Sequence, residues 1–244
     1  MINLLIADSN IYYAKSLVNY IVNKNSEIRL SNISTDGKEA LYNIISKPVD
    51  VVLLDLKMPS LSGIDILNIL NKNQANKKIN IIVISEEIEL ISKIKCNTLV
   101  EYFINKSQGM KYILKKIEDV IEKSNLEDSS NKIRDKALNE LLYLGYNIKH
   151  KGTIYLLDTI CIICQSENTS LIYNLEKYLY SEIASKYQKN IKNIKSNIMK
   201  ATDCMYMECD KNRLKEYFSF AYDYKPTPKV IIGTIISKIM NSIK

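Results

Sequence analysis

The first half of the chain alternates short apolar runs with amphipathic helical patterns. Five runs rich in branched aliphatic residues occur, at residues 2–7, 28–33, 51–54, 81–84 and 102–104. The segments between and after these runs place apolar residues three and four positions apart, as amphipathic helices do. Because the runs are apolar on both faces, they predict a five-stranded parallel sheet covered by helices on both sides, an α/β doubly wound domain.

The second half has helical periodicity without a convincing strand pattern. Apolar residues repeat at helical spacing within four stretches, at residues 138–142, 154–161, 175–183 and 191–198. Between the two halves, residues 123–132 are polar and lack periodicity, which is typical of a linker. We therefore predict a first domain over residues 1–122, a linker over residues 123–132 and an all-α domain over residues 133–244.

Length and composition favour two soluble domains. The 244 residues are too many for a typical small domain, and 46% of them are hydrophobic. The amino terminus lacks the basic leader of a signal peptide, and no apolar stretch approaches the roughly 18–20 residues of a membrane span. We expect a cytoplasmic protein without a membrane partner, whose five cysteines are thiols.

The basic excess lies mainly in the second half. The net charge is +7; residues 1–125 carry 16 basic and 14 acidic side chains, whereas residues 126–244 carry 18 and 13. Only Arg29, Arg134 and Arg213 are arginines, so lysines supply nearly all of the positive charge. The positive charge favours DNA as a partner. Arginine, which usually recognises guanine through two hydrogen bonds, is scarce in this chain.

Residues that suit phosphoryl chemistry follow four of the predicted strands: Asp8, Asp55, Ser85 and Lys106. Ligands of open parallel sheets bind beyond the carboxyl ends of the strands, so we expect these side chains to converge on one mouth. There Asp55 can act as the nucleophile and, with Asp8, hold Mg2+. Lys106 can neutralise the transferred group, and Ser85 can donate a hydrogen bond to it. Any one of them alone would fit a solvated loop residue or a helix cap.

Two motifs near these residues resemble the receiver domain of two-component response regulators. Residues 51–59, VVLLDLKMP, followed by Gly63, look like the phosphoacceptor strand and loop of that family. Residues 35–41, TDGKEAL, look like the start of its second helix, and Ser85 and Lys106 fall at the expected spacing. The resemblance covers about residues 1–122 and implies a flavodoxin-like fold.

The same resemblance implies roles for individual residues. Asp55 becomes the site phosphorylated by a histidine kinase or a phosphotransfer protein. Lys57 supplies a backbone carbonyl to Mg2+, and Phe103 is the aromatic residue that switches together with Ser85.

Two departures from the receiver pattern leave alternatives open. The family usually has adjacent acids after the first strand, whereas this chain has Asp8 and Ser9, so we expect weaker Mg2+ binding. The family also has proline after the lysine, where this chain has Ser107, and we expect a trans bond or a strained loop there. One hypothesis is a working phosphoreceiver with weak metal binding. The other is a pseudo-receiver that switches or dimerises without phosphate.

Residues 178–205 predict two adjoining helices with a tight turn at Lys189 and Asn190. A small residue, Ala184, suits a close helix crossing, as in a helix-turn-helix unit. The second helix is expected to present polar residues opposite its isoleucines, which makes it a DNA-binding candidate: Lys189, Lys192, Asn193, Lys195, Ser196 and Lys200. A lysine-rich solvated face is the alternative interpretation.

Four segments of the second half resemble the effector domain of the family of the master sporulation response regulator of endospore-forming bacteria. They are residues 141–145, 148–156, 179–187 and 225–228, and the resemblance spans roughly residues 135–242. It implies an all-helical domain that binds DNA through a helix-turn-helix and forms a homodimer when the receiver is phosphorylated. The family presents arginines and a glutamate to the bases, whereas this chain has Lys195, Ser196 and Met199, so the operator sequence does not carry over.

The sequence thus predicts a transcriptional regulator rather than an enzyme. The alternative function is an interaction protein whose degenerate receiver and lysine face bind a protein partner. Cys161 and Cys164 have the spacing of a zinc or redox pair, but they lie in an apolar helical stretch and are expected to be buried hydrophobes. His150, the single histidine, is expected to cap a helix or lie on the surface.

Overall fold

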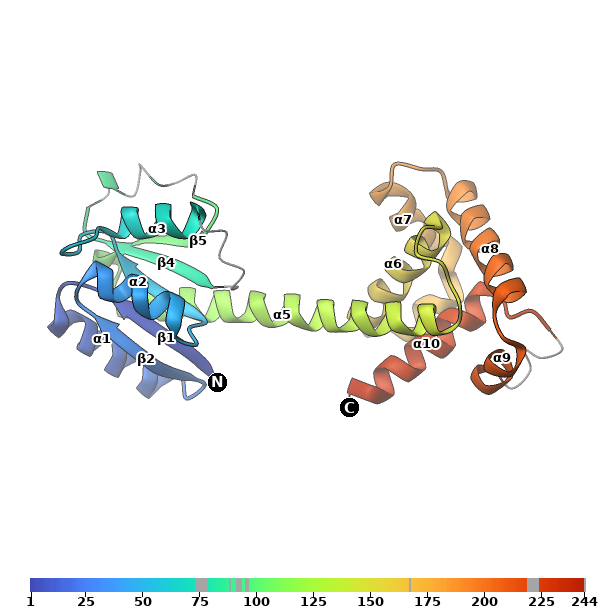
Figure 1. Cartoon of the computed structure of the whole chain (residues 1–244), viewed down its shortest axis with the longest axis horizontal. Coiled ribbons are helices and arrows are strands. Elements are labelled where there is room, and N and C mark those ends of the chain that lie inside the picture. The colour runs from blue at the N-terminus through green and yellow to red at the C-terminus, as the bar shows by residue number, and fades with distance from the viewer. Residues whose placement is uncertain are drawn as a thin grey trace. The chain divides into compact units, whose positions relative to one another are not determined.

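The computed structural model divides the chain into two compact units, Met1–Asn125 and Leu126–Lys244 (Figure 1). The structure describes residues 1–72, 79–87, 89–90, 94, 97–166, 168–218 and 224–243. Each unit has its own hydrophobic core, and each is described by itself below.

The first unit is built on a five-stranded parallel sheet. Its strands are β1 (Ile2–Ala7), β2 (Ile28–Ser34), β3 (Val51–Asp55), β4 (Asn80–Ser85) and β5 (Val100–Asn105). The strand order is β2-β1-β3-β4-β5, and every neighbouring pair is parallel. The predicted doubly wound α/β fold is therefore confirmed, with strand ends within about two residues of those expected.

Helices cover both faces of this sheet, as Figure 1 shows. On one face α1 (Ile11–Lys24) and the start of α5 (Met110–Tyr143) pack on residues such as Leu4. On the other face α2 (Gly37–Ser46) and α3 (Gly63–Lys72) pack on residues such as Leu5. Successive strand residues point to opposite faces, so Leu4 and Leu5 are fully buried in different cores, which explains the uninterrupted apolar runs.

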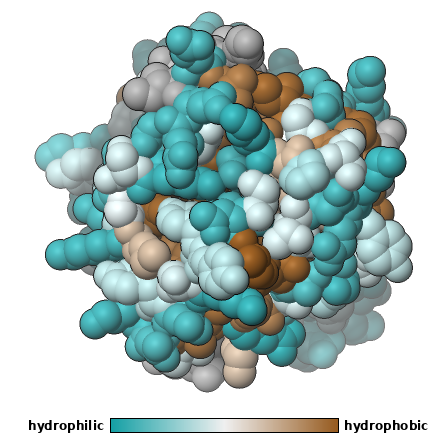
Figure 2. Space-filling model, turned by 90° about the vertical axis from the view of Figure 1, so that its left-hand side faces the viewer, coloured by the Kyte–Doolittle hydropathy of each residue, from teal (hydrophilic) through white to brown (hydrophobic). Residues whose placement is uncertain are grey.

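The face of this unit seen in Figure 2 is largely hydrophilic, with hydrophobic side chains showing in patches between the polar ones. Scattered apolar residues of this kind are normal on the surface of a folded domain. The apolar content of the strands therefore lies mostly in the two cores.

The segment predicted to be a linker is helical. Residues 123–132 lie inside α5, which is 34 residues long, and the division between the two units, after Asn125, falls within this stretch. This stretch contains no glycine or proline, and a helix that is polar all round needs no packing stripe where it lies in solvent. The helix ends at a Schellman motif: Gly145 has φ 89°, and the Tyr146 amide donates to the Leu141 carbonyl over 3.0 Å.

The described part of the second unit contains helices and turns but no strand, which confirms the all-α prediction. After α5 come α6 (Lys151–Ser166), the 3₁₀ turn η2 (Thr169–Asn174), the π-helical turn η3 (Leu175–Leu179), α7 (Tyr180–Lys186), α8 (Ile191–Glu208), α9 (Lys211–Tyr217) and α10 (Pro228–Ile243). Among the helices in the described ranges, none is long and apolar enough to cross a membrane.

Helix α6 is the centre of this core. Leu156, Ile160 and Ile163 are fully buried. Near its amino terminus, a Cβ atom on Gly152 would lie 2.0 Å from the Asn197 carbonyl oxygen of α8, so only glycine allows this approach. Close packing therefore fixes the position of α8.

The cysteines of α6 are buried, as predicted. Burial raises the pKa of the Cys161 and Cys164 thiols to about 11, so both are protonated near neutral pH. Cys209 is also buried, and Cys96 lies outside the described residues. These thiols behave as small apolar side chains rather than as metal ligands.

Candidate functional site

The carboxyl edge of the sheet brings charged residues together at one mouth. Asp55 and Ser85 are the last residues of β3 and β4, Asp8 directly follows β1, and Lys106 directly follows β5. The Lys106 ammonium nitrogen lies 2.7 Å from Asp8 Oδ2 and 2.8 Å from Asp55 Oδ2. Asp8, Asp55 and Lys106 therefore meet at one mouth, where the two carboxylates share one cation.

This charged cluster is shielded from solvent. The side chains of Asp8, Asp55 and Lys106 are 0%, 7% and 10% exposed. Burial opposes the charged form of Lys106, but the interactions of its ammonium group with the Asp55 and Asp8 carboxylates outweigh burial and raise the pKa of this lysine. The three charges sum to −1, so the mouth has capacity for a further cation.

Asp8 has an oxygen that is incompletely satisfied. Its Oδ1 accepts the Asn10 amide over 2.9 Å. Its Oδ2 contacts Lys106 as an ion pair, without a well-directed hydrogen bond from any described residue. Burial raises the pKa of this carboxyl and outweighs the opposing effects of Lys106 and Asn10.

The loop after β3 holds Asp55 in place. Its Oδ1 accepts the Lys57 amide over 3.2 Å. A Cβ atom on Gly63 would lie 2.3 Å from the Asp55 carbonyl oxygen, so only glycine allows the first residue of α3 to pack against the backbone of Asp55. This glycine belongs to the phosphoacceptor motif noted in the sequence. The Lys57 side chain is 80% exposed and pairs with Glu87 over 3.0 Å, which leaves its carbonyl as the group relevant to a metal.

The donors at this mouth fit Mg2+, which prefers oxygen ligands. Asp8 and Asp55 offer carboxylate oxygens, and Asp8 Oδ2 is the incompletely satisfied atom. Ser9, next in sequence, is exposed and adds only a neutral hydroxyl. When bound there, Mg2+ would neutralise negative charge on the carboxylates and on an incoming phosphoryl group.

The structure places the two predicted switch residues differently. Ser85 is buried, and its hydroxyl accepts the Glu87 amide over 3.1 Å. Phe103 is half-buried and packs against the core beneath α2 and α3. The bond between Lys106 and Ser107 is trans, as expected without proline, since the described residues contain no cis peptide.

Tyr13 of α1 belongs to this mouth, and the sequence interpretation missed it. Lys106 Nζ lies 5.0 Å from the centre of its ring, within the range of a cation–π contact. The Tyr13 hydroxyl is buried without a hydrogen-bond partner among the described residues, and burial raises its pKa. The only signal was an aromatic residue one helical turn after Asn10, which also fits an ordinary core position.

In the second unit, α7 and α8 form the predicted pair of helices. They are joined at residues 187–190, where Gln188 adopts φ 51° and the Lys189 amide donates to the Ala184 carbonyl over 2.9 Å. Asn190 caps α8 by accepting the Asn193 amide over 2.7 Å. Ala184 is buried, as a close crossing of the two helices requires.

The DNA-binding candidates are exposed, with two changes from the prediction. Lys189 lies in the turn rather than on the second helix, which begins at Ile191. Lys195 is not free, because it forms an ion pair with Glu176 of η3. The remaining candidates are exposed on α8: Lys192, Asn193, Ser196 and Lys200.

A buried aspartate connects α5 and α6 with the end of α7. Asp158 is 2% exposed and accepts hydrogen bonds from Arg134 Nη1 over 2.7 Å, Lys186 Nζ over 2.6 Å and Tyr187 Oη over 2.8 Å. Burial would raise its pKa, but these three bonds outweigh burial and lower it. In the sequence this residue is a single acid in an apolar helix, and the pattern alone does not distinguish it.

Comparisons with known proteins agree with this division. The family model of the response regulator receiver domain matches residues 4–118. The model of the sporulation initiation factor Spo0A C-terminal domain matches residues 137–239. Together they cover both units of the structure.

Solved structures that resemble the first unit include three from different organisms. A LuxR-family DNA-binding response regulator from Staphylococcus aureus is 20% identical and has a TM-score of 0.45, with 49% of this chain and 98% of that chain covered. CheY in a CheX complex with BeF3 and Mg2+ from Borrelia burgdorferi is 26% identical, with a TM-score of 0.42 and coverage of 49% and 89%. A CheY-like receiver protein from Methanospirillum hungatei is 20% identical, with a TM-score of 0.45 and coverage of 51% and 98%.

The sheet, its charged mouth and the first family match define a response-regulator receiver. The second family match assigns the helical unit, residues 137–239, as an effector domain of the Spo0A type. The protein belongs to the two-component response regulators that carry a Spo0A-type effector domain after the receiver.

Proposed function

We propose that this protein is a cytoplasmic, phosphorylation-responsive transcriptional regulator that acts in sporulation control and is not an enzyme. The carrying observation is that Lys106 lies between Asp8 and Asp55 at the carboxyl edge of the sheet. A nucleophile, a counter-charge and a metal-binding carboxylate are the groups that transfer of a phosphoryl group to a carboxylate requires.

In the proposed reaction, an oxygen of Asp55 attacks the phosphorus of a phosphohistidine in a histidine kinase or phosphotransfer protein. An O–P bond forms, the N–P bond breaks, and the imidazole leaves with the electron pair. Lys106 stabilises the negative charge that arrives on Asp55. The Ser85 hydroxyl then donates a hydrogen bond to a phosphoryl oxygen, and the Phe103 ring moves inward with Ser85.

The output is proposed to be promoter DNA binding by the face of α8. The four lysines of this face, Lys189, Lys192, Lys195 and Lys200, would contact phosphates. Asn193 and Ser196 would reach base edges. Homodimerisation on phosphorylation would place two such faces on one site.

The lysine face is tested by the salt dependence of binding. Full-length protein and the double variant Lys192→Ala with Lys195→Ala are titrated with genomic duplexes at several salt concentrations. The slope of log K against log salt is expected to flatten by roughly 0.9 for each phosphate that is no longer neutralised by a lysine. An unchanged slope would show that this face does not touch DNA.

A pseudo-receiver is the second candidate, and Ser9 favours it because the position lacks the usual second acid. Phos-tag electrophoresis after incubation with acetyl phosphate and Mg2+ separates the two. An adduct on the wild type supports the phosphoreceiver. An adduct on Ser9→Asp alone would identify a receiver that has lost phosphorylation and acts through a protein partner.

A further inference from the structure

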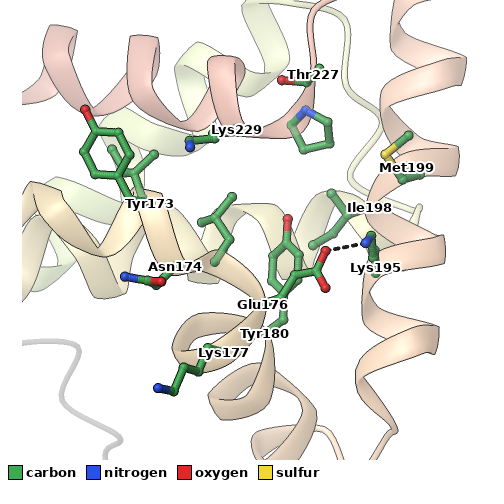
Figure 3. A pocket seen from close by; sticks show the side chains of 13 residues that line it. Tyr173, Asn174, Glu176, Lys177, Tyr180, Lys195, Ile198, Met199, Thr227 and Lys229 are labelled. Carbon is green, nitrogen blue, oxygen red and sulfur yellow. Dashed lines mark hydrogen bonds and ion pairs between the residues drawn. The ribbon is translucent and has the colours of Figure 1, made fainter.

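The second unit contains a cavity of about 460 Å³ that the proposed DNA-binding role does not explain. Figure 3 shows it between the π-helical turn η3, α8 and the start of α10. Its volume lies within the roughly 300–1,000 Å³ of small-molecule sites.

The cavity has a positive rim. Lys195 of α8 and Lys229 of α10 line it. Lys195 forms an ion pair with Glu176, and the Lys229 ammonium lies 4.7 Å from the centre of the Tyr173 ring. The 16-residue helix α10 also begins here, and the positive end of its dipole adds to the field.

Tyr180 is the independent sign of a ligand. The residue is 4% exposed and lines the cavity, and none of the described residues forms a hydrogen bond with its hydroxyl. Figure 3 shows this hydroxyl pointing into the cavity, beside the Glu176 carboxylate. Burial and the charge of Glu176 raise the pKa of Tyr180 to about 12, so the hydroxyl keeps its proton and can donate it to an acceptor.

The remaining wall is apolar. Ile198 and Met199 of α8, together with Leu175 and Pro228, line it. A ligand that satisfies both surfaces needs a negative, hydrogen-bond-accepting head and a compact apolar body.

We propose that this cavity binds a small organic anion, a carboxylate or phosphate group on an aromatic or short acyl body. Lys229 and the Tyr180 hydroxyl hold the head, and Ile198 and Met199 contact the body. A DNA backbone phosphate would use the lysines but leave the apolar wall and Tyr180 without a role.

Isothermal titration calorimetry on the full-length chain tests the site. The probes are benzoate and phenyl phosphate, with benzyl alcohol as the uncharged analogue. Lys229→Met removes the charge and keeps an apolar stem, and Tyr180→Phe removes only the hydroxyl. Lys211→Met, at an exposed position on α9 outside the cavity, is the matched control.

We expect saturable binding of at least one anion and none of benzyl alcohol. The comparison of benzoate with phenyl phosphate identifies the head group. Lys229→Met is expected to weaken binding about tenfold, and Tyr180→Phe roughly three- to tenfold, since each removes a bond to a charged group. Lys211→Met should bind like the wild type.

Three results would overturn the proposal. They are the absence of saturable heat from either anion at millimolar concentration, equal binding of benzyl alcohol, and unchanged affinity in both cavity variants. If Lys229→Met loses duplex DNA affinity while no small anion binds, the cavity belongs to DNA and the proposal is wrong.

Discussion

Lys106 Nζ lies 2.8 Å from Asp55 Oδ2, while Asp55 Oδ1 accepts the Lys57 amide. Both oxygens of the proposed phosphoacceptor are therefore engaged before any phosphoryl group arrives. The same ammonium also compensates Asp8, which is fully buried. Changing the charge on Asp55 must therefore redistribute the interactions of Lys106, and this links phosphorylation to the rest of the mouth.

Replacing Lys106 by methionine is expected to destabilise the receiver. Two buried carboxylates would be left without their shared cation, and breaking such a pair costs about 3 kcal/mol of unfolding free energy. Urea unfolding at neutral pH measures this loss, and Mg2+ should recover part of it by replacing the missing charge. Lys38→Met, an exposed position on α2, is the control. Equal stability of the two variants would contradict the role given to Lys106.

Ser9→Asp is expected to tighten Mg2+ binding about tenfold, because it adds an anionic oxygen ligand beside Asp8. Calorimetric titration of the apo protein with Mg2+ measures the change. Ser9→Asn has a similar size without the charge and should stay near the wild type. If Ser9→Asn binds Mg2+ as tightly as Ser9→Asp, then the missing negative charge at position 9 is not what limits the affinity for Mg2+.

The buried Asp158 predicts an acid-sensitive second unit. Its pKa is lowered in the folded state, so its stabilising contribution is complete above the unfolded value of about 4 and is lost as pH falls through the folded value. Asp158→Asn should cost about 3 kcal/mol at neutral pH and remove this part of the pH dependence.

Thermal or urea unfolding, measured from pH 7 down to acidic pH, gives both the loss of stability in Asp158→Asn and the change in its pH dependence. The control is Asp135→Asn, which removes the same charge from an exposed position on α5. A pH profile for Asp158→Asn that parallels the wild type below pH 4 would show that the Asp158 cluster does not titrate as described.

Lys195 pairs with Glu176, so in the proposed DNA complex Glu176 would compete with a DNA phosphate for this lysine. Glu176→Gln removes this partner and is expected to tighten DNA binding about two- to fivefold at low salt, the scale of a surface ion pair. Gel shifts at two salt concentrations measure the change. Glu182→Gln removes an exposed acid from α7 and serves as the control. An equal gain in DNA affinity in both variants would show that only the change in net charge matters, and would contradict the specific role of Glu176.

The sequence predicted the sheet well because its strands are buried on both faces, which leaves uninterrupted apolar runs. The positions of Asp8, Asp55 and Lys106 followed from the rule that strand ends share an edge. Tyr13 and Asp158 could not be singled out, because their roles depend on which helix faces them. An isolated tyrosine or aspartate carries no periodic signal.

The helical structure of residues 123–132 was not predicted, for a different reason. Residues 123–132 lack an apolar stripe, and periodicity detects a helix only where one face is buried. The continuity of α5 follows instead from composition, because no glycine or proline interrupts residues 110–144. The helix is bounded by Gly109 and Gly145, and both glycines have a positive φ that is not helical. The ion pair of Lys195 was likewise hidden, since Glu176 is distant in sequence.

The most direct test of the account measures DNA affinity of the full-length protein before and after treatment with acetyl phosphate and Mg2+, alongside Asp55→Asn. Intact mass spectrometry of the same samples reports the phosphoryl adduct. We predict one adduct and about tenfold tighter DNA binding for the wild type, and neither change for Asp55→Asn. Equal DNA affinity of the wild type before and after treatment, or an adduct on Asp55→Asn, would contradict the central claim.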